Sequence, residues 1–323
     1  MKNVICIVCP KGCEMQVDVE TSRRAIKEKI ADPLHMSIEE AAHGVYRMIN
    51  ANMLGAMRIV TVQRGHDPRD FAMMASGGTA SIHAARMAQE LRIPRVICPL
   101  IPGVFSAYGL ITADAAYDVF RSYVTRTTTA DPEMICKIYA ELKEEGLKRV
   151  EEMGFDKGEI VVQYGLELRY LGQAHEVSIE IPAELVENVC TVDLSAIVSI
   201  FHTRHKELFG YAQEKAPVEL ITLKVKASCP NKNRKHFKIE VGGKDSLAAK
   251  KGTRPVYFEE YKGFKECETY NRYLLKANNE IMGPAIVEQK DTTIVLPPNT
   301  WGRVDAFGNL IIEIDEASKE CMI

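Results

Sequence analysis

The sequence predicts a mixed fold, with an α/β part over about residues 33–125 and a β-rich α+β part after it. Between residues 71 and 99, a short apolar strand, a glycine turn, a helix and a second short strand follow one another, which is the order of a parallel βαβ unit. After residue 158, alternating apolar and polar residues and frequent turn residues replace this order.

The first element with strong signals is a long helix that begins after Ser37. The stretch Ser37-Ile-Glu-Glu40 is a capping box, and its acidic residues lie in the first helical turn. Apolar residues then recur at helical spacing. They are Ile38, Ala41, Ala42, Val45, Met48, Ile49, Met53, Met57 and Val60. The preceding residues 21–32 are charged and show no clear period.

The later elements follow in order along the chain. The βαβ unit is expected as strand 71–75, turn 76–79, helix 81–91 and strand 95–99, with a further helix over 106–115. Helices are expected over 132–153 and 194–209, closed by Gly154 and Gly210. Strands 159–170 and 177–181 form a plausible hairpin, and strands 220–226 and 310–314 follow.

The composition excludes several classes of protein. The chain has 323 residues, a net charge of −3 and 46% hydrophobic residues, so it has no broad basic field for nucleic acid or an anionic membrane. No apolar run approaches the roughly 20 residues of a membrane-spanning helix, and Val4–Val8 is too short for a signal peptide. We expect a cytoplasmic protein that binds neither nucleic acid nor membrane.

Cysteines fall into two groups. Six are scattered among apolar residues and indicate reduced, buried thiols. They are Cys98, Cys136, Cys190, Cys229, Cys267 and Cys321. Cys6, Cys9 and Cys13 instead have C-x2-C-x3-C spacing, which is typical of an iron–sulfur or Zn²⁺ site. A tetrahedral site needs a fourth ligand, and His35 or an outside group would have to supply it.

Two segments of the α/β part have the residue types of a ligand site. Gly77-Gly78-Thr79 lies between a strand and a helix, where it can cradle a phosphate or simply make a tight turn. His83 follows on that helix, as a catalytic or a packing residue. The loop His66-Asp67-Pro68 is either a functional loop, in which Asp67 orients His66, or a solvated turn.

The β-rich part offers two more candidates. Arg169 and Gln173 in LRYLGQ can bind a carboxylate or an amide, or can pair across strands at the surface. His202 and His205 lie three residues apart on a helix, and without an evident third ligand we interpret them as surface histidines.

Taken in order, these stretches resemble the hydantoinase A/5-oxoprolinase family. The similar segments are ADPLHMSIEEAAHGVYRMINANMLGAMRIVTVQRGHDPRDF, ASGGTASIHAARMAQELRIPRVICPLIPGVFSAYGLITADAAYD, LRYLGQAHEV, FHTRHKELFGYA, PVEL and MGPAIVEQKDTTIVLPP. They span about residues 31 to 315.

The resemblance implies an actin-like (RNase H-like) ATPase of two lobes. It implies that residues 31–126 are the second ATPase lobe and that 127–323 are a β-rich hydantoinase A C-terminal domain. Residues 1–20 would be a cysteine-rich segment of different origin, carrying a partial cluster motif. The family's chemistry is ATP- and Mg²⁺-dependent hydrolysis of a cyclic amide such as 5-oxoproline or a hydantoin.

The resemblance also implies roles for single residues. Gly77, Gly78 and Thr79 would lie near the nucleotide. His66, Asp67 and His83 would be catalytic. Arg169 and Gln173 would bind substrate.

The sequence departs from the family pattern in two places. Ala80 and Ser81 stand where the family has glycine and proline, and Ala80 would restrict the backbone if a positive φ were required. No D-x-G-G-T phosphate loop precedes residue 31. We therefore expect another chain to supply the first lobe, beside a hydantoinase B-type partner subunit.

Two alternatives remain open at this point. One is a subunit of an ATP-dependent ketone carboxylase of the acetone type. The other is a metal-binding or remnant protein without enzymatic activity.

Overall fold

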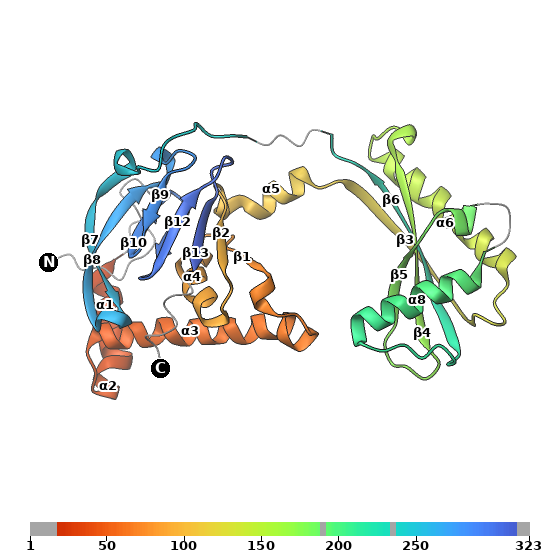
Figure 1. Cartoon of the computed structure of the whole chain (residues 1–323), viewed down its shortest axis with the longest axis horizontal. Coiled ribbons are helices and arrows are strands. Elements are labelled where there is room, and N and C mark those ends of the chain that lie inside the picture. The colour runs from red at the N-terminus through yellow and green to blue at the C-terminus, as the bar shows by residue number, and fades with distance from the viewer. Residues whose placement is uncertain (1–17, 188–191, 233–236, 315–323) are drawn as a thin grey trace. The chain divides into compact units, whose positions relative to one another are not determined.

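The computed structural model describes residues 18–187, 192–232 and 237–314. The chain divides into two compact units, and each is described by itself (Figure 1). Unit 1 combines residues 1–110 with 235–323, and unit 2 is the intervening segment 111–234. Within the described ranges, no helix has both the length and the apolar character needed to cross a membrane.

This division differs from the linear boundary between residues 126 and 127 that the sequence suggested. The reason is that the C-terminal strands return to the first part of the chain. Strand β13 (Leu310–Ile314) pairs antiparallel with β2 (Arg95–Cys98), and Leu310 lies opposite Cys98. Residues from both ends of the chain therefore build one core.

A five-stranded sheet forms the centre of unit 1. Its strand order is β1 (Ala72–Met74), β2, β13, β12 (Thr300–Val304) and β9 (Glu280–Met282). Strands β1 and β2 are parallel and joined by α4 (Ala80–Leu91), which confirms the expected βαβ unit. Helix α4 buries Ala84, Ala85, Met87 and Ala88 in the core of unit 1, to which strands of this sheet contribute.

A second sheet of unit 1 has four strands in the order β11 (Thr293–Leu296), β10 (Ala285–Glu288), β8 (Gly263–Asn271) and β7 (Lys250–Phe258). Strands β7 and β8 form an antiparallel hairpin, while β10 runs parallel to β8. Strand β7 is an edge strand, so in the described part of the chain one side of its backbone has no neighbouring strand.

Helix α3 (Ile38–Val60) begins as the sequence predicts. The Ser37 hydroxyl accepts from the Glu40 amide at 3.2 Å, and the Glu40 carboxylate accepts from the Ser37 amide at 2.9 Å. The helix buries only a narrow stripe, which contains Ala41, Asn50 and Leu54. Its apolar surface is therefore much less covered than the sequence pattern suggests, and Met48 is 64% exposed.

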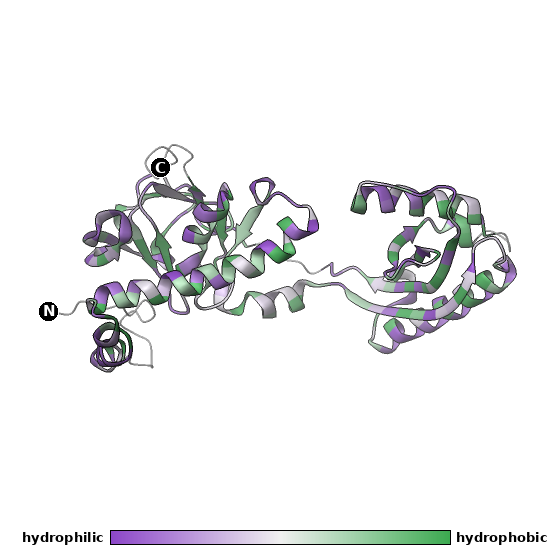
Figure 2. Ribbon diagram, turned by 90° about the horizontal axis from the view of Figure 1, so that it is seen from below, coloured by the Kyte–Doolittle hydropathy of each residue, from purple (hydrophilic) through white to green (hydrophobic). Residues whose placement is uncertain are grey.

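Helices α1 (Val19–Ile26) and α2 (Asp32–Leu34) precede α3 in the segment where the sequence showed no period. Helix α1 is predominantly polar and none of its residues is buried, so it leaves no apolar pattern to recognise. Helix α5 (Phe105–Thr112) is apolar yet exposed, and Leu110 is 80% exposed. Figure 2 shows hydrophobic residues along α3 and α5.

Unit 2 is a four-stranded antiparallel sheet with helices. The strand order is β3 (Ala115–Arg126), β6 (Val218–Cys229), β4 (Val161–Tyr170) and β5 (Val177–Ile181). The helices are α6 (Pro132–Glu152), α7 (Glu184–Glu187) and α8 (Leu194–Phe209). The β4–β5 hairpin and the helix ends near Gly154 and at Gly210 agree with the sequence, whereas β3 was not predicted.

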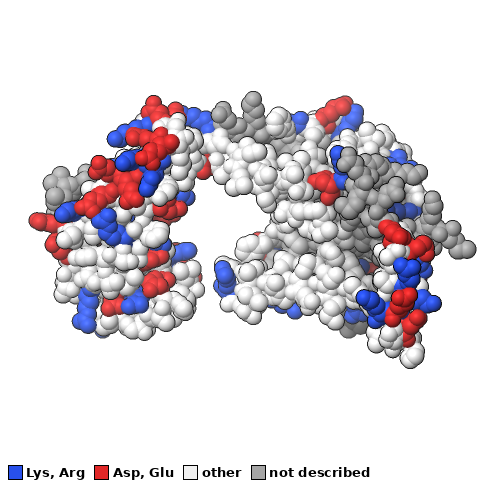
Figure 3. Space-filling view, turned by 180° about the vertical axis from the view of Figure 1, so that it is seen from behind, with Lys and Arg blue, Asp and Glu red and all other residues white. Residues whose placement is uncertain are grey.

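The surface charge is mixed. On the face drawn in Figure 3, acidic and basic side chains are interspersed, and neither unit presents a broad field of one sign there. Among the described cysteines, Cys98, Cys229 and Cys267 are buried and Cys136 is half-buried, and these four form no disulfide bond within the described residues. This agrees with the expected reduced state. Cys190 and Cys321 lie outside the described residues.

Candidate functional site

The glycine turn after β1 requires glycine at its first position. Gly77 has a φ of +98°, and its amide donates to the carbonyl of Pro102 at 2.7 Å. A side chain at a positive φ is strained, so Gly77 cannot be replaced without cost. Ala80 is the first residue of α4 and is not among the positive-φ residues, so alanine fits at this departure from the family pattern.

The loop that contains Asp291 closes over this turn. One carboxylate oxygen of Asp291, Oδ2, accepts from the Gly103 amide at 2.8 Å. A Cβ on Gly78 would lie 3.4 Å from the Asp291 carbonyl, and a Cβ on Gly103 would overlap the Asp291 side chain. The segments at residues 77–78, 102–103 and 291 therefore lie close together, and at Gly103 the approach of Asp291 leaves no room for a side chain.

Polar atoms remain available in this region. The buried atoms Asp291 Oδ1 and Thr292 Oγ1 have no hydrogen-bond partner in the described part of the chain. Helix α4 starts at the same turn, and its N-cap Thr79 makes no side-chain capping bond. The first N–H groups of this helix therefore offer donors and the positive end of the helix dipole to a ligand.

Two buried side chains fix the loop that follows β2. The Arg272 guanidinium donates to the carbonyls of Cys98, at 3.3 Å, and Gly308. Gln289 donates from Nε2 to the Leu100 carbonyl at 2.6 Å. Burial lowers the pKa of Arg272 to about 10 and raises the pKa of the Cys98 thiol to about 11, so the cysteine is a protonated packing residue.

His83 is oriented by a residue of α3. Its Nδ1 lies 2.7 Å from Oδ1 of Asn50, and because the amide oxygen can only accept, Nδ1 carries the proton. Burial lowers the pKa of His83, which favours the neutral ring. The Tyr46 ring stacks on His83 with centroids 5.0 Å apart. Nε2 of His83 then carries the lone pair, which suits it to accept a proton.

The loop with His66 and Asp67 makes local contacts. Asp67 caps the Arg69 amide at 2.9 Å and pairs with the Arg69 guanidinium, whose hydrogen bonds lower the pKa of Asp67 to about 2. His66 meets the Phe71 ring edge to face at 5.9 Å. Asp67 thus orients the backbone of the loop.

Arg169 and Gln173 lie in unit 2 and have partners within it. Arg169 is opposite Glu219 on β6, and Nε of Arg169 donates to that carboxylate at 3.0 Å, which is the cross-strand pairing considered from the sequence. Gln173 accepts from the Tyr170 amide at 3.2 Å and its Nε2 meets Nε2 of His205, also at 3.2 Å.

The interpretation of His205 as a surface histidine was wrong. The residue is 0% exposed, and its Nδ1 donates to the Tyr211 carbonyl at 2.8 Å. The helix places His205 on the face that packs on the sheet, where Gln173 and Tyr211 satisfy both of its nitrogens. His202 is half-buried, and its Nδ1 lies 2.8 Å from the Tyr170 hydroxyl.

The expected metal ligands Cys6, Cys9 and Cys13 lie outside the described residues. Within the described ranges, no three His, Cys, Asp or Glu side chains gather as ligands for a metal ion. The proposed fourth ligand, His35, is the residue that ends α2, in a left-handed conformation.

Sequence reasoning missed two residues of this region, Asn50 and Asp291. Asn50 looks like a break in the apolar pattern of α3, and only its contact with His83 explains it. Asp291 lies within the segment MGPAIVEQKDTTIVLPP that carried the resemblance, so that segment was the available signal.

Comparison with known proteins gives two family matches along the chain. The model described as "Hydantoinase/oxoprolinase" matches residues 6–119. The model described as "Hydantoinase/oxoprolinase C-terminal domain" matches residues 124–315. The first match takes in Cys6, Cys9 and Cys13, whereas the resemblance seen in the sequence began at about residue 31.

One similar curated protein is the caprolactamase subunit alpha of Pseudomonas jessenii. It is 32% identical over 290 residues, which are 89% of this chain and 41% of the relative. The chain therefore spans about two fifths of that relative's length.

Two solved structures share the fold. The crystal structure of the ATP-dependent caprolactamase from Pseudomonas jessenii matches with a TM-score of 0.78 and 30% identity, over 95% of this chain and 45% of that chain. The nucleotide-free structure of acetone carboxylase, an enzyme of ATP-dependent acetone carboxylation, matches with a TM-score of 0.74 and 25% identity, over 94% and 44%. These neighbours have the actin-like ATPase fold, so the expected fold class is confirmed.

Proposed function

The chain belongs to the hydantoinase/oxoprolinase family, and from this membership we propose that it is part of an ATP-dependent enzyme that hydrolyses a cyclic amide. The likeness to an ATP-dependent caprolactamase supports this proposal. The observation that carries it is the Gly77–Gly78 turn, which opens α4 directly beneath the Asp291 loop. Because the chain spans about two fifths of this relative, we propose that it acts as a subunit or part of one.

The residues of the turn fit a nucleotide. Gly77 and Gly78 let a ligand approach the backbone, and the N–H groups at the start of α4 can donate to phosphate oxygens. Asp291 Oδ1 is buried and unpartnered among the described residues, and a carboxylate in that position suits a ribose hydroxyl or Mg²⁺ rather than a phosphate. Bound ATP would supply the phosphoryl group that activates the amide carbonyl.

His83 is the residue best placed to move a proton. It lies on the first turn of α4, its ring is held by Asn50, and Nε2 is the basic nitrogen. His66 and Asp67 remain predicted catalytic residues, and their loop makes local contacts. Arg169 and Gln173 remain predicted substrate-binding residues, although both have partners within unit 2.

The proposal includes partners. A hydantoinase B-type subunit would take part in hydrolysis, and the phosphate-loop lobe would complete the ATPase, whether from this polypeptide or from another. The likeness to acetone carboxylase supports a second candidate function, that of a ketone carboxylase subunit. A metal-binding protein is a further alternative, which depends on Cys6, Cys9 and Cys13.

Substitution at Gly78 tests the proposal. We expect Gly78→Val to lower ATP affinity at least about tenfold, because the branched side chain would fill the space between the turn and the Asp291 loop. Calorimetry of ATP binding, on the chain isolated with the polypeptides that co-purify, measures this change.

Gly243→Val is the matched control. A Cβ at Gly243 meets nothing within 4 Å and its φ is not positive, so this variant should bind ATP normally. Equal ATP affinity in the wild type and in a folded Gly78→Val variant would show that the turn is not part of the nucleotide site.

A further inference from the structure

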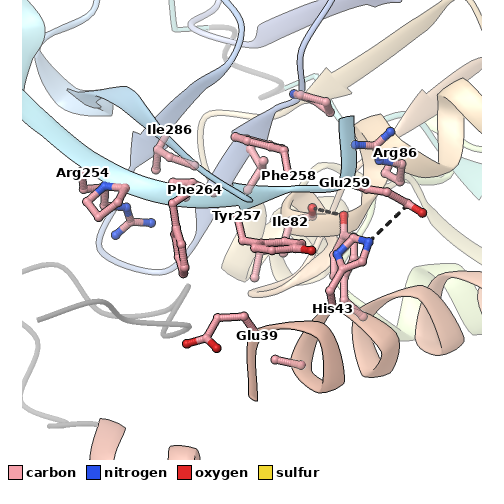
Figure 4. A pocket seen from close by; sticks show the side chains of 16 residues that line it. Glu39, His43, Ile82, Arg86, Arg254, Tyr257, Phe258, Glu259, Phe264 and Ile286 are labelled. Carbon is pink, nitrogen blue, oxygen red and sulfur yellow. Dashed lines mark hydrogen bonds and ion pairs between the residues drawn. The ribbon is translucent and has the colours of Figure 1, made fainter. Parts of the chain in front are cut away.

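Unit 1 contains an apolar cavity of 130 Å³ between the start of α3, helix α4 and the β7–β8 hairpin. Its walls are mostly rings and branched aliphatic side chains, among them Tyr46, Tyr257, Phe264, Ile82 and Ile286. Figure 4 shows the Phe264 side chain reaching from β8 toward the first turns of α3, where Glu39 lies.

The cavity has the size of one small ring. An apolar cavity of about 150 Å³ is large enough to bind benzene, so 130 Å³ suits a single small ring of about that bulk. The rings in the wall are already ordered by one another. Tyr257 meets Phe264 edge to face at 5.8 Å, and His43 lies 5.3 Å from Tyr257.

Every charged side chain that lines the cavity has a partner of opposite charge. Arg86 pairs with Glu260 at 2.6 Å, and both side chains are less than 20% exposed, at 17% and 19%. Arg254 pairs with Glu288 at 3.3 Å, and Glu39 pairs with Arg23 at 3.0 Å.

His43 and Glu259, which also line the cavity, face each other. His43 lies 3.2 Å from the Glu259 carboxylate, and Figure 4 shows this contact. Among the described residues that line it, the cavity therefore has no unpaired cation for an anionic ligand. A carboxylate placed inside would lose its water without gaining a counter-charge, which costs several kcal/mol.

The wall still offers partners for a neutral amide. Strand β7 supplies Arg254 to Phe258 to the cavity and is the edge strand of its sheet. Alternate residues of an edge strand point their N–H and C=O groups away from the neighbouring strand, and except at Pro255, which has no N–H, these groups can pair with the C=O and N–H of an amide. Tyr46 donates to the Ile82 carbonyl at 3.2 Å, and burial raises its pKa, so it stays a neutral phenol.

Two residues that line the cavity also lie next to His83. Tyr46 lines the cavity and also stacks on His83, the proposed proton acceptor. Ile82 lines it from the first turn of α4, the helix that the glycine turn opens.

We propose that this cavity binds the ring of a neutral cyclic amide, with the ring carbons against the aromatic wall and the amide against the free edge of β7. The proposal rests on the proposed function and narrows its substrate class. It favours unsubstituted lactams and disfavours ring amides that carry a carboxylate, such as 5-oxoproline.

A binding experiment without ATP tests this proposal. Saturation-transfer NMR on the full chain would compare ε-caprolactam, 2-pyrrolidinone and 5-oxoproline, the last being 2-pyrrolidinone with an added carboxylate. We expect both lactams to bind and 5-oxoproline to bind at least about tenfold more weakly than 2-pyrrolidinone. Equal binding of these two, or no binding of either lactam, would overturn the proposal.

Two variants locate the binding. Ala42→Phe should fill the cavity from α3 and abolish lactam binding, whereas Ala56→Phe, at an exposed position of the same helix, should leave it unchanged. If Ala42→Phe does not fold, Phe264→Ala removes one wall and should weaken lactam binding several-fold. Lactam binding that survives both changes contradicts the assigned place.

This test is independent of the nucleotide site. Because ATP is left out, a failure to bind lactams would rule out the proposed ring-binding cavity only. ATP binding at Gly78 would still be judged by calorimetry. Conversely, normal ATP binding by the Gly78→Val variant would rule out the proposed nucleotide site and would not affect the conclusion about lactam binding.

Discussion

At the scale of single residues, one contact determines the chemistry of His83. Asn50 accepts the Nδ1 proton at 2.7 Å, and burial lowers the pKa of the ring. Because the pKa in the folded chain lies below the ordinary value of about 6.5, neutral His83 favours folding above that pH. This contribution is lost as the pH falls through the pKa of the folded state.

Asn50→Asp tests the contact. A carboxylate beside Nδ1 favours the charged imidazolium, so the pKa of His83 should rise relative to the wild type. NMR titration of the His83 ring measures the pKa directly. The control is Asn52→Asp, at an exposed position of the same helix, which should shift the pKa little. An unchanged pKa in Asn50→Asp would show that Asn50 does not orient His83.

The sequence identifies only part of this site, for a physical reason. Gly77 and His83 follow one another in a strand, turn and helix, so local pattern reveals them. Their partners are distant in the chain: Asn50 is 33 positions from His83, and Asp291 is 188 positions from Gly103. A contact of that separation leaves no periodicity, and only tertiary packing creates it.

At the scale of elements, Gln173 ties the β4–β5 hairpin to α8. It satisfies the Tyr170 amide on one side and the buried His205 on the other. Gln173→Leu leaves both groups without this partner, and we expect it to destabilise unit 2 by about 1–3 kcal/mol. Hydrogen exchange of peptides from β4 and α8 during urea unfolding would measure the loss of stability in unit 2 alone.

Gln163→Leu is the matched control for this change. Gln163 is exposed on β4, the strand that leads into the turn with Gln173, so its substitution should alter stability by less than about 0.5 kcal/mol. Equal stability of the two variants would show that Gln173 does not hold α8. A loss of substrate binding in Gln173→Leu without a loss of stability would favour the predicted substrate-binding role of Gln173.

Elements with local start and stop signals were predicted well. The capping box at Ser37 and the left-handed Gly210 mark helix ends, and both are found where expected. Helix α1 and strand β3 were missed, because α1 buries no residue and β3 buries only Val119. An element that covers little core carries little hydrophobic pattern.

At the scale of the whole molecule, unit 1 is built from two distant stretches of chain. Strand β13 inserts between β2 and β12, so the residues after 235 complete the sheet that begins at β1. The sequence could not show this return, because strand order in a sheet depends on pairing between strands rather than on the pattern within one. The same return brings Asp291 to the glycine turn.

The most direct test of the proposed function is ATP turnover by the chain isolated with its native partners. ATP hydrolysis would be measured with ε-caprolactam, hydantoin or 5-oxoproline, and separately with acetone plus bicarbonate. We expect a cyclic amide to stimulate ATP hydrolysis, and its ring to open in step with ATP consumption. Stimulation by acetone and bicarbonate alone, or by none of these compounds, would contradict the proposed function.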